Sequence, residues 1–210
     1  MTHRLLLGPL LLLFALSPAA AAADYSPPAL NDLVLGSDVI VAGEVVSLSA
    51  TSFSLRIDDL ITGQITTPEI EVQRFTDWTC AARWAPYRVG QRALLFLRRD
   101  ASGKFQIRSG GGEGEMPIVG DHVYVNSFYN VVAPAGAAAY HRHTVHGGGF
   151  MGFAVPKAEF FAALREARRC FVADLGSSHQ VQRVRRTCTA PGRALTGSAV
   201  GRALLTALSP

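Results

Sequence analysis

Residues 38–58 read DVIVAGEVVSLSATSFSLRID and decide the fold class. In the second half, Phe53, Leu55 and Ile57 alternate with polar residues, the pattern of a half-buried antiparallel strand. The first half, residues 39–46, is apolar at nearly every position, so we expect a longer strand with both faces largely buried. A short turn at residues 49–51 joins the two strands into a predicted hairpin.

Further short strands are expected downstream, with no long helix between them. Their predicted positions are residues 69–75, 92–97, 104–108 and 116–125. The second of these contains a continuous apolar run at 93–97, which predicts burial on both faces of that strand. Short strands at such spacing are typical of a small barrel or sandwich.

One helix is predicted over about residues 156–171, because Phe160, Ala163, Leu164 and Ala167 would share one face. We therefore expect a mainly β domain over residues 24–171. It would be a small antiparallel barrel of five or six strands, with a single C-terminal flanking helix.

Charge is distributed unevenly along the chain. Hydrophobic residues make up 49% and charged residues 17%, which excludes a charged disordered protein. Residues 24–160 carry eleven basic and fourteen acidic residues, whereas residues 161–210 carry eight arginines and two acids. We expect the basic tail, residues 172–210, to be solvated and poorly ordered, and contact with an anionic partner is the alternative.

The N-terminus has the pattern of a secretory signal peptide over residues 1–23. A short basic start precedes an apolar run at 5–16, and an alanine run ends at Ala23. We expect cleavage near Ala23, a mature chain that begins at Asp24, and a periplasmic or extracellular location. A retained membrane anchor is the alternative, but the apolar run is short for a bilayer span. No other segment is predicted to form a stable membrane span.

Three cysteines allow at most one intramolecular disulfide. We expect Cys80–Cys170, which would tie the helix to the barrel. A Cys170–Cys188 bridge, or no bridge, stays open. Cys188 is disfavoured because it lies in the expected disordered tail, where ordering costs entropy.

Four stretches of the chain carry a resemblance to a known class of protein. They are residues 37–45, residues 59–63, the Gly-Gln-Arg element with its apolar strand at 87–97, and the glycine-rich segment at 111–125. Together they resemble uncharacterised secreted bacterial proteins with an OB-like barrel, similar in layout to the netrin/tissue-inhibitor-of-metalloproteinases (NTR-like) module. The resemblance covers about residues 36–171 and implies a fold more than an activity. The inhibitor branch uses an N-terminal cysteine to ligate a protease's zinc, and no cysteine lies near Asp24.

A histidine cluster is the sharpest candidate for chemistry. His141, His143 and His146 fall within six residues, between an alanine-rich and a glycine-rich segment that predict a loop. Three neutral imidazoles suit Zn²⁺ or Cu²⁺. No acidic residue follows closely to orient an imidazole, so a solvated loop without metal is the favoured interpretation.

Two further groups are candidate ligand contacts. Trp78, Trp84 and Tyr87 would offer an aromatic platform, or else pack over the barrel mouth. Glu113 and Glu115 would share a face in an extended chain, whereas the glycines around them favour a turn or bulge. A rigid ligand-contacting loop is the expected role of the glutamates if they are functional.

The function that we expect is an exported, non-enzymatic binding protein for a protein, glycan or envelope component. No cofactor and no nucleic-acid partner are expected. The alternative is a metal-binding protein, with or without hydrolase activity, that would use the histidine cluster.

Overall fold

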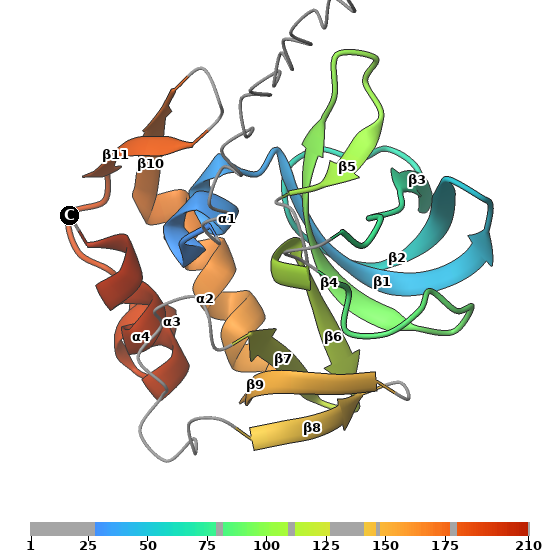
Figure 1. The fold of residues 1–210 in the computed structure, drawn as a ribbon. Helices are drawn as coiled ribbons and strands as arrows, with labels where there is room; N and C mark the ends of the chain where they lie inside the picture. Colours follow the sequence, from blue (N-terminus) through green and yellow to red (C-terminus); the bar gives the residue numbers. More distant parts are fainter. Residues whose placement is uncertain are drawn as a thin grey trace, which may run out of the picture.

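The computed structural model describes residues 28–78, 82–108, 112–126, 141–145, 148–176 and 180–209. Its elements, in chain order, are α1 (Leu30–Gly36), β1 (Val39–Leu48), β2 (Ser52–Thr62), β3 (Glu69–Gln73), β4 (Arg92–Arg99), β5 (Phe105–Ile107), η1 (Gly112–Gly114), β6 (Glu115–Val119), β7 (His122–Asn126), β8 (His141–Val145), β9 (Gly148–Pro156), α2 (Lys157–Cys170), β10 (Phe171–Leu175), β11 (Val181–Arg186), α3 (Arg193–Thr196) and α4 (Ala199–Leu208). Figure 1 shows the barrel on one side and the helices on the other.

Five strands close into a barrel in the order β1–β2–β3–β5–β4, and β4 pairs back onto β1. β3 and β5 run parallel, and the other neighbours in the barrel run antiparallel. This order and closure confirm the predicted mainly β fold, a small barrel of the OB-like kind. Beyond β4 the sheet continues through β6, β7, β9 and β8, so it holds more strands than the five or six expected.

β1 and β4 form a wall between two hydrophobic cores. Val41 and Leu95 point into the barrel, whereas Ile40 and Phe96 point into the core beneath the helices. All four side chains are fully buried. Each of these two strands therefore faces a core on both sides, which explains its continuous apolar run and confirms the burial that we predicted from it.

The flanking helix α2 lies close to its predicted range. Phe160, Ala163, Leu164 and Ala167 are buried and face the second core. The predicted strand at 116–125 is two strands, β6 and β7, joined by a turn at Gly120. That glycine has φ of 55°, a left-handed conformation that favours glycine.

The basic tail is folded, which corrects the expectation of poor order for residues 172–210. β10 and β11 form a two-stranded hairpin, and α3 and α4 follow it. Leu195, Leu204 and Leu208 are at most 1% exposed in the core that also holds α2. The physical reason is the apolar face of α4, which packs into this core. The N-terminus of α4 is also capped, because Ser198 Oγ accepts the Gly201 N–H.

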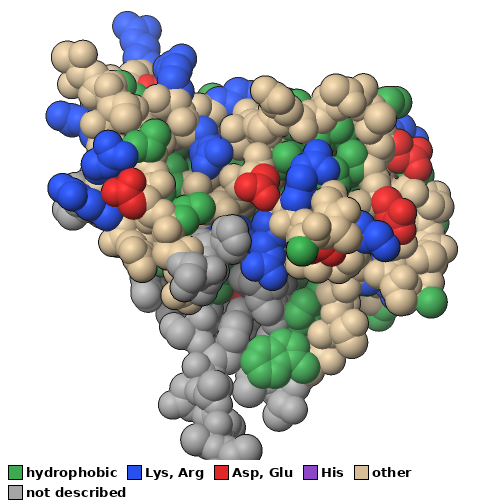
Figure 2. Space-filling view, turned by 90° about the horizontal axis from the view of Figure 1, so that it is seen from above, with side chains coloured by type: hydrophobic (Ala, Val, Ile, Leu, Met, Phe, Trp, Pro, Cys, Tyr) green, Lys and Arg blue, Asp and Glu red, His purple; other side chains and the backbone are tan. Residues whose placement is uncertain are grey.

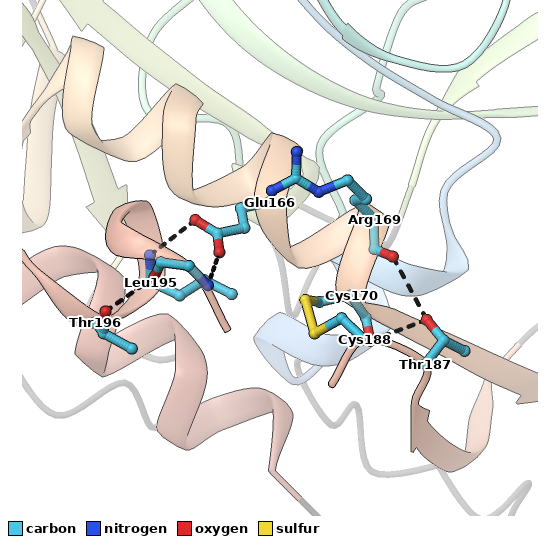
Figure 3. The surroundings of a disulfide bond; sticks show 8 residues. Glu166, Arg169, Cys170, Thr187, Cys188, Leu195 and Thr196 are labelled. Atoms are coloured by element: carbon cyan, nitrogen blue, oxygen red, sulfur yellow. Dashed lines mark hydrogen bonds between the residues drawn. A yellow bond between two sulfur atoms is a disulfide. The ribbon is translucent and has the colours of Figure 1, made fainter. Parts of the chain in front are cut away.

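The disulfide joins Cys170 and Cys188, which shows that the preferred Cys80–Cys170 pairing is wrong (Figure 3). The β10–β11 hairpin brings the chain back to the end of α2, where the Thr187 N–H donates to the Cys170 carbonyl at 2.8 Å. The two cysteines therefore face each other because the tail is ordered. Cys80 lies outside the described residues.

Two arginines from distant parts of the chain hold the C-terminal end of α1. Arg108 Nη1 donates to the Gly36 carbonyl at 2.7 Å, and Arg168 Nη1 donates to the Leu35 carbonyl at 2.8 Å. The last carbonyls of a helix lack intrahelical donors and favour cations. A Cβ atom at Gly36 would collide with the Arg108 guanidinium, so this approach requires glycine.

None of the helices within the described ranges has the length and apolarity needed to cross a membrane.

Candidate binding groove

The connection between β3 and β4 contributes Arg83 to a buried charge pair with Glu115 of β6. Arg83 Nη2 lies 2.5 Å from Glu115 Oε1, and Arg83 Nε donates to Glu115 Oε2 at 2.9 Å. The side chains are 3% and 1% exposed. Two parallel contacts of this kind give a strong, geometrically specific pairing. The ion pair fixes the connection to the start of β6.

Gln91 and Tyr87 add further hydrogen bonds around this pair. Gln91 Oε1 accepts from Arg83 Nη2 at 3.0 Å and from the Arg88 N–H at 3.1 Å. Tyr87 Oη donates to Glu115 Oε2 at 3.2 Å and accepts the Phe75 N–H at 3.1 Å. Buried charges are tolerated only when their hydrogen bonds are complete, and this network meets that condition.

Two aromatic rings enclose the Arg83 guanidinium. Its carbon lies 4.0 Å from the ring centre of Trp84 and 3.8 Å from that of Tyr87. Cation–π contacts of desolvated arginines are favourable. Burial raises the pKa of Tyr87 well above the ordinary tyrosine value, nearby Glu115 raises it further, and Arg83 opposes both effects. Tyr87 is therefore a neutral hydrogen-bond donor at physiological pH.

Two adjoining pockets lie beside this network, with volumes of about 450 and 390 Å³. Ala50, Arg74 and Thr76 line both pockets, and we call the combined surface the barrel groove. Its other polar and aromatic lining includes Asp77 and Tyr87 in the first pocket and Ser52, Glu71, Gln73 and Lys104 in the second. The groove thus spans the β1–β2 turn, β3 and the β4–β5 turn.

The charges in the barrel groove are held in place by neighbours. Arg74 Nη1 donates to the Ser49 carbonyl at 2.7 Å, and its guanidinium carbon lies 5.0 Å from the Tyr87 ring centre. Ser52 Oγ donates to Glu71 Oε1 at 2.6 Å. Asp77 Oδ1 accepts the backbone N–H of Arg83 at 2.9 Å. The groove presents a fixed set of donors and acceptors.

The structure brings together three of the five predicted ligand residues. Trp84, Tyr87 and Glu115 all contact Arg83. Trp78 belongs to the same connection and is 45% exposed, outside the described lining of the two pockets.

Glu113 and Glu115 do not form the extended pair that alternation suggested. Glu113 lies in the 3-10 turn η1, and Glu115 begins β6. Gly114 between them is required by packing, because a Cβ atom there would collide with the Arg108 carbonyl. The turn interpretation therefore describes this segment better than a shared strand face does.

The histidine cluster was expected on a loop, but His141 and His143 lie in strand β8, opposite Gly152 and Phe150 of β9. Their side chains and all of His146 lie outside what the structure describes, so the metal site stays a prediction. Among the side chains that are described, no group of three His, Cys, Asp or Glu residues could hold a metal ion.

Sequence reasoning missed Arg83, which joins Trp84 to Glu115, and the groove residues Arg74, Glu71 and Lys104. Arg83 and Glu115 are 32 residues apart, and no spacing rule connects a loop arginine to a glutamate at that distance. The one local signal is Arg83 directly before Trp84, a residue order that permits stacking but does not predict burial.

Comparison with protein-family models and with curated proteins finds no match for this chain.

Proposed function

We propose that this chain is an exported, non-enzymatic binding protein that takes an oligosaccharide in the barrel groove. The observation that carries the proposal is the position of the groove, which spans the β1–β2 turn, strand β3 and the β4–β5 turn of a closed five-strand barrel. OB-like barrels bind oligosaccharides and oligonucleotides on this face and these loops.

The chemistry of the groove favours an oligosaccharide over a nucleic acid. Arg74 and Lys104 are balanced by Glu71 and Asp77, and the third lining cation, Arg83, is paired with buried Glu115, so the groove has no excess of positive charge. A polyanion would meet both carboxylates, whereas a neutral polyhydroxylated ligand would find hydrogen-bond partners in every charged and amide side chain. The ring of Tyr87 adds an apolar surface beside these groups.

The network beneath the groove supports binding by preorganisation. Asp77 and Tyr87 line the groove and also bond to the chain around Arg83 and Phe75. Because the buried pair of Arg83 and Glu115 fixes this connection, little conformational entropy remains to be lost when a ligand binds.

We also propose export through the signal peptide at residues 1–23, and membership of the secreted bacterial proteins similar to the NTR-like module. The Cys170–Cys188 disulfide supports export, because disulfides persist in oxidising compartments. Mass spectrometry of the secreted protein should give a mature N-terminus at Asp24. A full-length chain retained in the cytoplasm would contradict export.

The binding test uses the secreted protein on an array of neutral and acidic oligosaccharides, followed by calorimetry on the best ligand. Ala50 is exposed and lines both pockets, so Ala50→Trp should fill the groove and weaken binding at least tenfold. Ala190→Trp adds the same bulk at an exposed tail position and should leave affinity unchanged. Equal affinity of the wild type and Ala50→Trp, or no oligosaccharide bound, would contradict the proposal.

A further inference from the structure

The C-terminal part of the molecule exposes charge of almost one sign. From residue 161 onward, the exposed basic side chains in the described ranges are Arg165, Arg169, Arg183, Arg185, Arg186, Arg193 and Arg202. Asp174 is the exposed acid of the same part, since Glu166 is buried. Figure 2 shows Lys and Arg side chains gathered along the edge that carries β10 and β11, on the left in both views.

Ion pairs neutralise little of this charge. Arg165 pairs with Asp59 of the barrel, and Arg185 pairs with Asp174 across the hairpin at 3.1 Å. Within the described residues, Arg183 and Arg186 form no ion pair. The hairpin therefore keeps a net positive surface.

The hairpin has one face on the core and one face outward. Ala173 and Val184 pair in register and pack against the helical core. The alternate pairs, Val172 with Arg185 and Asp174 with Arg183, lie on the opposite face. Arg186 pairs with buried Phe171 and Leu175 pairs with Val181, so these two residues belong to the core-side face at the two ends of the hairpin. The hairpin is a separate two-stranded sheet on the helical side of the molecule, away from the barrel (Figure 1).

An exposed apolar side chain lies among the arginines of the outward face. Val172 of β10 is 38% exposed and pairs with Arg185. A soluble polyanion would need the charges alone. Apolar side chains beside basic ones are the combination that binds at a membrane interface, where arginines meet lipid phosphates and apolar groups enter the acyl boundary.

We propose that the β10–β11 hairpin docks the protein reversibly on an anionic lipid surface. Arg183 and Arg185 of the outward face would contact the phosphate headgroups, for which the planar guanidinium is well suited. Val172 of the same face would supply the shallow apolar contact. The inference does not depend on the barrel groove, because it uses none of its residues.

The test is co-sedimentation of the secreted, processed protein with vesicles of phosphatidylglycerol and phosphatidylcholine, or of phosphatidylcholine alone. Binding should require the anionic lipid and should weaken as salt rises. The double variant Arg183→Gln and Arg185→Gln should bind about 25-fold more weakly, at roughly fivefold per arginine. Val172→Ser should weaken the binding that remains at high salt.

A matched control changes two exposed arginines of the barrel part, Arg56 and Arg88, to Gln and alters the net charge equally. It should bind like the wild type, and circular dichroism checks that every variant is folded. No binding of the wild type to anionic vesicles, or an equal loss in both double variants, would overturn the proposal. Binding to duplex DNA or heparin without binding to vesicles would assign the surface to a soluble polyanion and would also overturn it.

Discussion

The carboxylate of Glu166, in the third turn of α2, accepts the backbone N–H of Gly192, the residue before α3 begins. Its other oxygen accepts the Leu195 N–H at 3.3 Å (Figure 3). Glu166 is 5% exposed. An acid on one helix thus supplies the N-terminal cap that α3 lacks in its own sequence, and this contact docks the tail on the core.

Glu166→Ala should lower the free energy of unfolding by about 1–3 kcal/mol, because it removes the carboxylate that accepts the part-buried Gly192 N–H and leaves the Leu195 N–H with the Gly192 carbonyl as its acceptor. Urea unfolding followed by circular dichroism measures the change. Glu159→Ala, an exposed position on the same helix, is the control and should be near neutral. Equal stability of the two variants would show that the cap contributes nothing.

Arg83→Leu and Glu115→Leu should each destabilise the protein by about 3–5 kcal/mol, because each leaves a buried charge without its partner. The double variant should lose less than the sum of the two. Asp58→Asn removes an exposed partner of Arg92 and should cost at most about 1 kcal/mol. Strictly additive losses in the double-mutant cycle would argue against direct coupling of Arg83 and Glu115.

Alkaline pH should destabilise the protein through Tyr87. Its pKa is raised in the folded state, mainly by burial. The unfolded chain therefore releases the phenolic proton first, and stability that is fully present below about pH 10 is lost as pH rises above it. Comparing wild type with Tyr87→Phe in urea between pH 8 and pH 11 isolates this effect. Parallel pH profiles for the two proteins would contradict it.

Removing the disulfide with Cys170→Ser and Cys188→Ser should lower the free energy of unfolding by about 2–4 kcal/mol, because the bridge restricts the unfolded chain. The two cysteines are 18 residues apart, so the loop that the bridge closes is short. Thermal unfolding with and without reductant gives the same comparison in the wild type. Peptide mapping without reduction should recover the 170–188 linkage. A linkage that involves Cys80 would contradict the structure.

The sequence predicted the barrel well because the signals for it are local. The two-sided apolar runs of β1 and β4, the alternation of Phe53 and Leu55, and the face of α2 each depend on burial at neighbouring positions. The tail was misjudged because Gly, Ser, Arg and Thr interrupt its apolar pattern. The apolar face of α4, with Val200, Leu204 and Leu208 at four-residue spacing, was overlooked among Gly, Ser and Arg.

The disulfide and the site show what local patterns cannot reach. The Cys80–Cys170 preference followed from the assumed disorder of the tail, so one error produced the other. Trp84 and Glu115 were named as separate candidates, yet the contact that joins them depends on where the β3–β4 connection places Arg83. The contact forms only because Arg83 lies next to Glu115 in the folded chain, and a single sequence does not show which distant residues become neighbours.

The capping of α1 has a consequence for the order of synthesis. α1 has seven residues, too few for a helix to persist alone in water. Its last carbonyls accept hydrogen bonds from Arg108 and from Arg168, and Arg168 lies 133 residues beyond Leu35. Both contacts with α1 can therefore form only after residue 168 has been synthesised, so α1 lacks this stabilisation during the early steps of the export that we propose.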